Sequence, residues 1–234
     1  MSERRLIVNA DDFGLSPGVN RGIVRAHEHG IVTSTSLMVR ATAVAEAVEM
    51  ARSLPTLALG IHVDLGEWHY AVDEWRPRYE VVPMHDPQRV AVEIEAQLEA
   101  FGRLVGRAPT HLDSHQHVHH DPNVKPVLLD IGARLGVPVR AMTPGITYNG
   151  AFYGQDGRGF PYAEAITVEA LVEIVRTLPA GTTELACHPG YASDVDTTYR
   201  SERSIEVDTL CDPAVRAAID EADVRLCSFA SLQR

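Results

Sequence analysis

The feature that most constrains the fold is a regular alternation of short apolar runs with longer amphipathic stretches along all 234 residues. The short runs have the length and the β-branched content of buried strands, and the longer stretches have helical periodicity. We expect strands at 6–10, 35–39, 57–63, 110–113, 137–142, 183–187 and 224–229. We expect helices at 19–29, 43–53, 87–105, 124–135, 168–178 and 213–222. Such an alternation predicts a parallel sheet with helices packed outside it.

The predicted fold class is therefore α/β, with about seven strands in a single catalytic domain over residues 1–234. This size suits a small, incomplete or distorted (β/α) barrel of the TIM type, and an open doubly wound sheet is the alternative. Two predicted loops, at 65–86 and 143–166, exceed the usual length of ~2–6 residues. Loops of that length in a compact domain are usually functional.

Composition and charge exclude several classes of partner and location. The formal net charge is −11 and the basic residues form no cluster, so nucleic acid and anionic membrane surfaces are not expected partners. No apolar run approaches the ~20 residues of a membrane span, and the N-terminal apolar run is too short for a signal peptide, which favours a cytoplasmic location. The three cysteines show no CxxC spacing, which argues against a disulfide framework or a thiolate zinc site.

Acidic and imidazole side chains follow four of the predicted strands. Asp11 and Asp12 come directly after the first strand, His62 closes the third, His115 follows the fourth and His188 follows the sixth. The carboxyl ends of parallel strands lie on one face of the fold, where ligands and catalytic groups collect. We therefore expect these side chains to meet.

Aspartate and histidine ligands with one open position are typical of a catalytic divalent-metal site. Of the two carboxylates at 11 and 12, one can ligate while the other accepts a proton from water, although one of them could instead cap the helix that begins near Pro17. His62 is predicted as a ligand. In the tract HLDSHQHVHH only one or two histidines can reach the same ion, and we favour His115.

The remaining polar residues of these segments receive supporting roles. Asp113 can orient a ligating imidazole, and His117 and His119 are predicted to lie around the ligands or to contact substrate. The alternative for this tract is a solvated loop with incidental metal affinity. His188 is the candidate general acid, opposite the aspartate base, and the role of His111 stays open.

Several segments resemble the YdjC-like carbohydrate deacetylases. The matching segments are LIVNADDFGLSPGVNRGI, GIVTSTSLMV, LALGIHVDL and GRAPTHLDSHQHVH, followed by HPGY and DVDTTYRSER. The resemblance implies a (β/α)-barrel-like deacetylase fold with one catalytic divalent metal, often assigned as magnesium. It implies that Asp12, His62 and His115 are metal ligands, that Asp11 is the base and that His188 is the general acid. Two features depart from the family: Gln116 stands where many relatives have a histidine, and the 65–86 loop looks short, which leaves the sugar open.

The predicted function is hydrolysis of an N-acetyl group on an amino sugar or short oligosaccharide. Aromatic residues of the two long loops can stack on sugar rings or simply pin the loops to the barrel: Trp68, Tyr70, Trp75, Tyr148, Phe152 and Tyr153. Imidazole ligands suit Zn²⁺, Mn²⁺ or Co²⁺ better than the Mg²⁺ that the resemblance implies. The expected partner is a small carbohydrate, and homo-oligomerisation stays open.

Two rival functions remain. A metal-dependent phosphoesterase or other amidohydrolase on the same fold predicts a basic residue near the ion, and Arg40 and Arg140 at strand ends are the only hints. A non-catalytic sugar- or metal-binding module predicts that Asp11 is dispensable.

Overall fold

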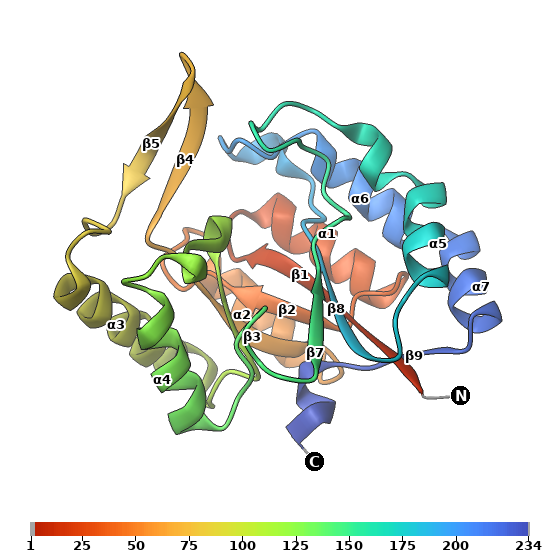
Figure 1. The fold of residues 1–234 in the computed structure, drawn as a ribbon, viewed down its shortest axis with the longest axis horizontal. Coiled ribbons are helices and arrows are strands. Elements are labelled where there is room, and N and C mark those ends of the chain that lie inside the picture. The colour runs from red at the N-terminus through yellow and green to blue at the C-terminus, as the bar shows by residue number, and fades with distance from the viewer. Residues whose placement is uncertain (1–2, 234) are drawn as a thin grey trace.

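A parallel sheet forms the centre of the computed structural model, which describes residues 3–233 (Figure 1). Its strands run in the order β6-β3-β2-β1-β8-β7, and β9 pairs with β1 beside this path. The strands are β1 (Arg4–Phe13), β2 (Ser34–Leu37), β3 (Ala58–Val63), β6 (Leu112–Ser114), β7 (Ile146–Asn149), β8 (Gly181–Cys187) and β9 (Val224–Leu226). The sheet curls into an incomplete barrel flanked by helices, which confirms the predicted fold class.

β1 lies in the middle of the sheet, and its side chains are therefore buried almost throughout. β8 pairs with it from Arg4 to Ala10 on one side. On the other side β9 pairs with residues Arg4 to Leu6, and β2 pairs with β1 from Asn9 onward. This division leaves the carboxyl end of β1 between β2 and β8, at the edge of the sheet where the other strands also end.

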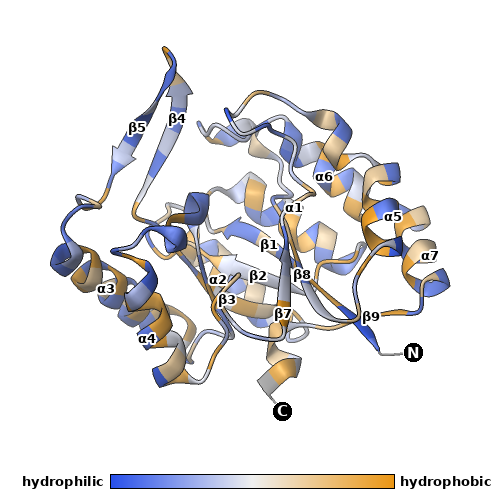
Figure 2. Cartoon of the chain, viewed as in Figure 1, coloured by the Kyte–Doolittle hydropathy of each residue, from blue (hydrophilic) through white to orange (hydrophobic). Residues whose placement is uncertain are grey.

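Helices cover the outside of the sheet. They are α1 (Pro17–Glu28), α2 (Val44–Ser53), α3 (Pro87–Val105), α4 (Lys125–Leu135), α5 (Val168–Arg176), α6 (Glu202–Leu210) and α7 (Pro213–Glu221). Short 3₁₀ helices are η1 (His115–His120), η2 (Ala163–Ile166), η3 (Ala192–Asp194) and η4 (Phe229–Gln233). Figure 2 shows that outer helices such as α3, α4 and α5 carry both hydrophobic and hydrophilic residues, as helices with one buried face do.

The structure corrects the predicted strand at 137–142. Val139 makes only an isolated bridge to Leu112, and Thr143 N–H bonds back to the Val139 carbonyl as a turn. Ala141 has a φ of 58°, a left-handed conformation that ends the extended backbone. The strand that joins the sheet after α4 is instead β7, inside the predicted loop at 143–166.

The predicted loop at 65–86 contains an antiparallel hairpin, β4 (Gly66–Ala71) and β5 (Glu74–Glu80), which projects from the barrel (Figure 1). Its turn residues Val72 and Asp73 both have positive φ, as a tight two-residue hairpin turn requires. Helix α6 is also not predicted from the sequence, and its buried residues include Glu202, Arg203 and Glu206. Polar residues on a buried face conceal the periodicity that identifies an amphipathic helix.

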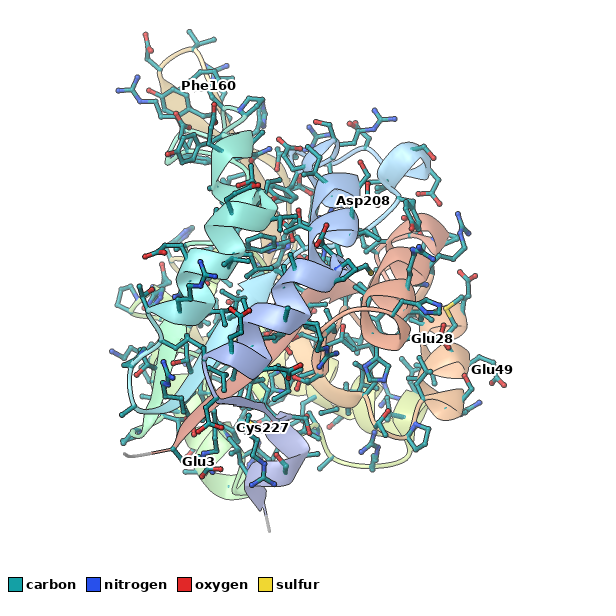
Figure 3. The ribbon with its side chains drawn as sticks, turned by 90° about the vertical axis from the view of Figure 1, so that its right-hand side faces the viewer. Glu3, Glu28, Glu49, Phe160, Asp208 and Cys227 are labelled. Atoms are coloured by element: carbon teal, nitrogen blue, oxygen red, sulfur yellow. The ribbon has the colours of Figure 1, made fainter. Side chains whose placement is uncertain are left out.

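The amino ends and the carboxyl ends of the parallel strands face opposite sides of the molecule. Figure 3 shows Phe160, in the loop after β7, far from Glu3 and Cys227 beside the start of β1. Within residues 3–233 no helix is long and apolar enough to cross a membrane.

Candidate active site

The carboxyl end of β1 is distorted where the two aspartates occur. The β1–β2 register shifts between Ala10 and Phe13, and Asp12 has a left-handed φ of 68°. Such a bulge redirects side chains that would otherwise point to opposite faces of the sheet. As a result, both Asp11 and Asp12 line the same cavity.

Asp12, His62 and His115 converge at this end of the sheet. Asp12 Oδ1 lies 3.2 Å from His62 Nε2 and 3.0 Å from His115 Nδ1. One ligand atom from each of the three buried side chains lies within 4.8 Å of the others. The structure therefore brings together the three residues predicted as metal ligands.

Asp113 fixes the orientation of His62. The two residues are direct neighbours across the β3–β6 pair, and Asp113 Oδ1 lies 2.7 Å from His62 Nδ1. With Nδ1–H donating to this carboxylate, the ring of His62 is fixed with Nε2 directed at Asp12. A carboxylate behind a ligating imidazole is the usual arrangement at metal sites.

The electrostatics of this cluster favour positive charge. Burial opposes protonation of His62, yet Asp113 and Asp12 raise its pKa to about 10. Burial likewise opposes protonation of His115, and Asp12 raises its pKa to about 9. A divalent ion would take the place of these protons, because ligating imidazoles must be neutral.

The donor set fits a divalent ion. It offers a carboxylate oxygen and two imidazoles, of which His62 is already oriented from behind by Asp113, and the three donors are spaced as ligands of one ion would be. Asp12, His62 and His115 are the residues that would hold the ion, and the cavity beside them supplies an open side.

Asp11 is held by Arg140. The Arg140 Nη2 atom lies 2.7 Å from Asp11 Oδ1, and Nη1 lies 2.5 Å from Oδ2. Burial opposes ionisation of Asp11, but Arg140 holds its pKa below the usual value. Asp11 is therefore a carboxylate at neutral pH, fixed in one orientation.

His188 lies across from Asp11, as the predicted acid–base pair requires. Its Nε2 is 3.6 Å from Asp11 Oδ2, and its ring packs against both Tyr153 and Tyr199, which stack on each other. Burial lowers the pKa of His188 to about 4, so the imidazole is neutral near pH 7.

The backbone at His188 is fixed by close packing of two glycines. A Cβ at Gly22 of α1 would lie 2.4 Å from the Cα of Gly190. Only glycine permits this approach of α1 to the turn after β8.

A cavity of about 820 Å³ opens above these groups. This volume lies within the ~300–1,000 Å³ of small-molecule pockets. Its walls include the six aromatic residues singled out in the two long loops, Trp68, Tyr70, Trp75, Tyr148, Phe152 and Tyr153. The hairpin therefore forms one wall of the cavity and the 148–160 loop forms another.

The two outer histidines of the tract differ in position. Among the residues that the structure describes, His117 lines the cavity, whereas His119 is buried and does not line it. His119 Nδ1 instead contacts Ser114 Oγ at 2.7 Å. Burial lowers the pKa of His117 to about 4 and that of His119 to about 3, so both rings are neutral.

Gln116, the departure from the family pattern, ties η1 to the hairpin. Its side-chain amide donates to the carbonyl of Trp68 at 2.9 Å and accepts from the Trp68 N–H at 2.7 Å.

Several charged partners of the site are not predicted from the sequence. Arg203 of α6 lies 2.6 Å from Asp12 Oδ2, and Glu67 of the hairpin lies 3.9 Å from His115 Nε2. Glu206 accepts from the His188 N–H and from the Tyr199 hydroxyl, and burial raises its pKa to about 8. The one available signal was that Arg203 ends the DVDTTYRSER segment.

The two arginines considered as a possible phosphate site, Arg140 and Arg40, both form ion pairs with carboxylates of the protein. Arg140 is fully buried and also pairs with Asp113 at 2.9 Å and Glu184 at 2.7 Å. Arg40 pairs with Glu93 of α3 at 3.0 Å. Among the described residues, neither of these two arginines lines the cavity.

Comparison with known proteins gives relatives over nearly the whole chain. A family model described as YdjC-like protein matches residues 5–221. A chitooligosaccharide deacetylase of Serratia marcescens is 32% identical, with 98% of this chain and 100% of the relative aligned. A chitooligosaccharide deacetylase of Citrobacter koseri is 33% identical, with 97% and 98% aligned.

Solved structures share the fold. A protein of Enterococcus faecalis V583, described as a candidate cellobiose-phosphate cleavage protein, superposes with a TM-score of 0.77 at 28% identity and covers 99% of both chains. A family 4 acetyl xylan esterase of Clostridium thermocellum, solved with a cobalt ion, superposes with a TM-score of 0.55 at 11% identity, over 98% of this chain and 90% of the other. At that identity the second likeness concerns the fold alone.

Proposed function

Because the chain belongs to the YdjC-like protein family, we propose that it is a metal-dependent deacetylase that removes N-acetyl groups from an amino sugar or a short oligosaccharide. The observation that carries the proposal is the convergence of Asp12, His62 and His115, from three separate strand ends, beside an aromatic-lined cavity. The relatives named chitooligosaccharide deacetylases support a short chitin-like oligosaccharide as substrate.

Asp12, His62 and His115 would hold one divalent ion. When bound, that ion supplies a Lewis acid that polarises a carbonyl oxygen and acidifies water. Imidazole ligands favour Zn²⁺, Mn²⁺ or Co²⁺, whereas the family resemblance favours Mg²⁺. Asp113 and Arg203 keep the ligands in position from behind, through His62 and Asp12 respectively.

Asp11 is the proposed general base. Its carboxylate lines the cavity and is ionised, and Arg140 prevents it from turning away. It accepts the proton of the attacking water at Oδ2, the oxygen that faces His188. Proton transfer of this kind typically contributes ~10²–10⁴-fold to a rate.

His188 is the proposed general acid toward the departing amine. Its imidazole is neutral before the reaction, so it needs a proton before it can donate one. The proton that Asp11 takes from water lies next to His188 Nε2, across a gap of 3.6 Å, and can be passed on to the amine. The water proton therefore ends on the leaving group, and acetate is released.

The test is acetate release from N-acetylated sugars, including chitooligosaccharides, by the wild type and by Asp11→Asn and Asp12→Asn, each with Mg²⁺, Mn²⁺, Co²⁺ or Zn²⁺. We expect Asp11→Asn to lose at least about 10²-fold in kcat while it still binds the ion, because it removes the base and not a ligand. Asp12→Asn should lose both activity and the ion.

Activity retained in Asp11→Asn would exclude Asp11 as the base. A phosphorylated disaccharide serves as a further arm, and phosphate release in place of acetate release would overturn the deacetylase assignment in favour of a phosphoesterase.

A further inference from the structure

A second cluster of imidazoles lies in η1, separate from Asp12, His62 and His115. It consists of His117, His119 and His120, and one ligand atom from each lies within 4.8 Å of the others. The ring centroids are 5.3 Å apart for His117 and His119 and 4.4 Å apart for His119 and His120. The two groups share no residue.

The backbone of η1 adopts an unfavourable conformation to form this cluster. Gln116 and His117 have left-handed φ values of 47° and 57°, although neither is glycine. Such a residue is strained and persists only where its surroundings hold it. Here the Gln116 amide is held by both backbone groups of Trp68, and the Tyr148 hydroxyl contacts His117 Nε2 at 3.3 Å.

His119 has a nitrogen with no partner. The ring is 0% exposed and its Nδ1 contacts Ser114 Oγ, but among the described residues nothing forms a hydrogen bond to Nε2. A buried polar atom without a partner is unfavourable, because it has lost its hydrogen bonds to water. One ring nitrogen held by a neighbour and the other left free is the arrangement of a metal-ligating histidine.

We propose that His117, His119 and His120 form a second metal site, which takes a borderline transition-metal ion such as Zn²⁺ at the rim of the cavity. Three imidazoles and no carboxylate select such an ion over Mg²⁺ or Ca²⁺, which prefer oxygen ligands. Three protein ligands leave a coordination position open. His117 and Tyr148 both line the cavity, so an ion here lies beside the substrate and apart from the catalytic centre.

The site is tested by Zn²⁺ titration of the metal-free full-length protein against a chromophoric chelator. His120 is exposed and has no assigned role in catalysis, so His120→Ala should fold normally. We expect two Zn²⁺ ions per chain for the wild type and one for His120→Ala. His85→Ala, which removes an exposed histidine that belongs to no such group within residues 3–233, should keep both ions.

Co²⁺ absorption provides an independent readout. The visible d–d spectrum of the protein loaded with two Co²⁺ ions per chain should lose one component in His120→Ala and in His117→Ala. Asp12→Asn should lose the other component, so failure of the catalytic site and failure of the rim site give different results. Equal Zn²⁺ stoichiometry and equal Co²⁺ spectra in the wild type and His120→Ala would overturn the proposal.

Discussion

The two oxygens of the Asp12 carboxylate face different partners. Oδ1 contacts the imidazoles of His62 and His115, and Oδ2 lies 2.6 Å from Arg203. Burial opposes ionisation of Asp12, but Arg203 and His115 hold its pKa well below the usual value. The arginine therefore keeps this carboxylate ionised and oriented, so that only the two imidazoles have protons to lose when an ion binds.

A second residue-scale constraint lies beneath the site, at Gly60 of β3. A Cβ at this position would lie 2.4 Å from the ring of His111, which also stacks on Phe229 with the ring centroids 3.9 Å apart. The ring cannot move away, and its Nε2 contacts Ser36 Oγ, which donates to Asp113.

We expect Gly60→Ala to lower the free energy of unfolding by about 1–3 kcal/mol, since overpacking of a closed core forces strain. Urea denaturation measures the change. The control is Gly102→Ala in α3, where a Cβ meets no atom within 4 Å and the substitution should stabilise the helix by up to about 1 kcal/mol. Equal stability of Gly60→Ala and the wild type would show that His111 is free to move.

At the scale of elements, side-chain contacts hold the hairpin β4–β5 in place as one wall of the cavity. Arg78 pairs with Asp196 at 2.6 Å, and Glu67 accepts from the Thr198 N–H at 3.1 Å. These contacts connect the hairpin to the segment after β8. Trp75, 52% exposed, packs edge-on against Tyr70 on the cavity wall.

We expect Trp75→Ala to raise KM for a chitooligosaccharide by about three- to tenfold with little change in kcat, because an aromatic contact contributes ~0.5–1.5 kcal/mol to binding. Steady-state kinetics of acetate release measure this effect. Val72→Ala, at the exposed tip of the same hairpin and not among the cavity-lining residues, should leave KM unchanged. A reduced kcat with unchanged KM in Trp75→Ala would indicate that the ring does not bind substrate.

The sequence predicted the elements that carry the ligands better than those that close the cavity. Asp12, His62 and His115 lie at the carboxyl ends of strands, and parallel strands end on one face. β7 has four residues within a glycine- and aromatic-rich segment, and α6 buries Arg203 and Glu206, so neither shows the usual periodicity. The contact of Arg203 with Asp12 spans 191 residues, and no local pattern encodes such a pair.

At the scale of the whole molecule, the sheet encloses several charged side chains whose opposite charges stabilise one another. Arg140, 1% exposed, pairs with Asp11, Asp113 and Glu184, and burial raises the pKa of Glu184 to about 7. Breaking a buried pair of this kind costs about 3–5 kcal/mol, so the site and the barrel core depend on each other.

His111 gives this balance a measurable pH dependence. Burial lowers its pKa from 6.5 to about 4, so the folded protein keeps the ring neutral where the unfolded chain protonates it. The stability it contributes is present above pH 6.5 and is lost as the pH falls to about 4. From this shift the wild type should lose on the order of 3 kcal/mol more than His111→Gln over that range. Urea denaturation at several pH values measures the difference, and parallel curves for the two proteins would contradict the assignment.

Whether Asp12, His62 and His115 hold one ion can be seen by anomalous diffraction from crystals soaked in Mn²⁺ or Zn²⁺. We expect an anomalous peak ~2.0–2.2 Å from Asp12 Oδ1, His62 Nε2 and a ring nitrogen of His115. An ion bound only at His117, His119 and His120, or no peak among the three proposed ligands at saturating metal, would contradict it.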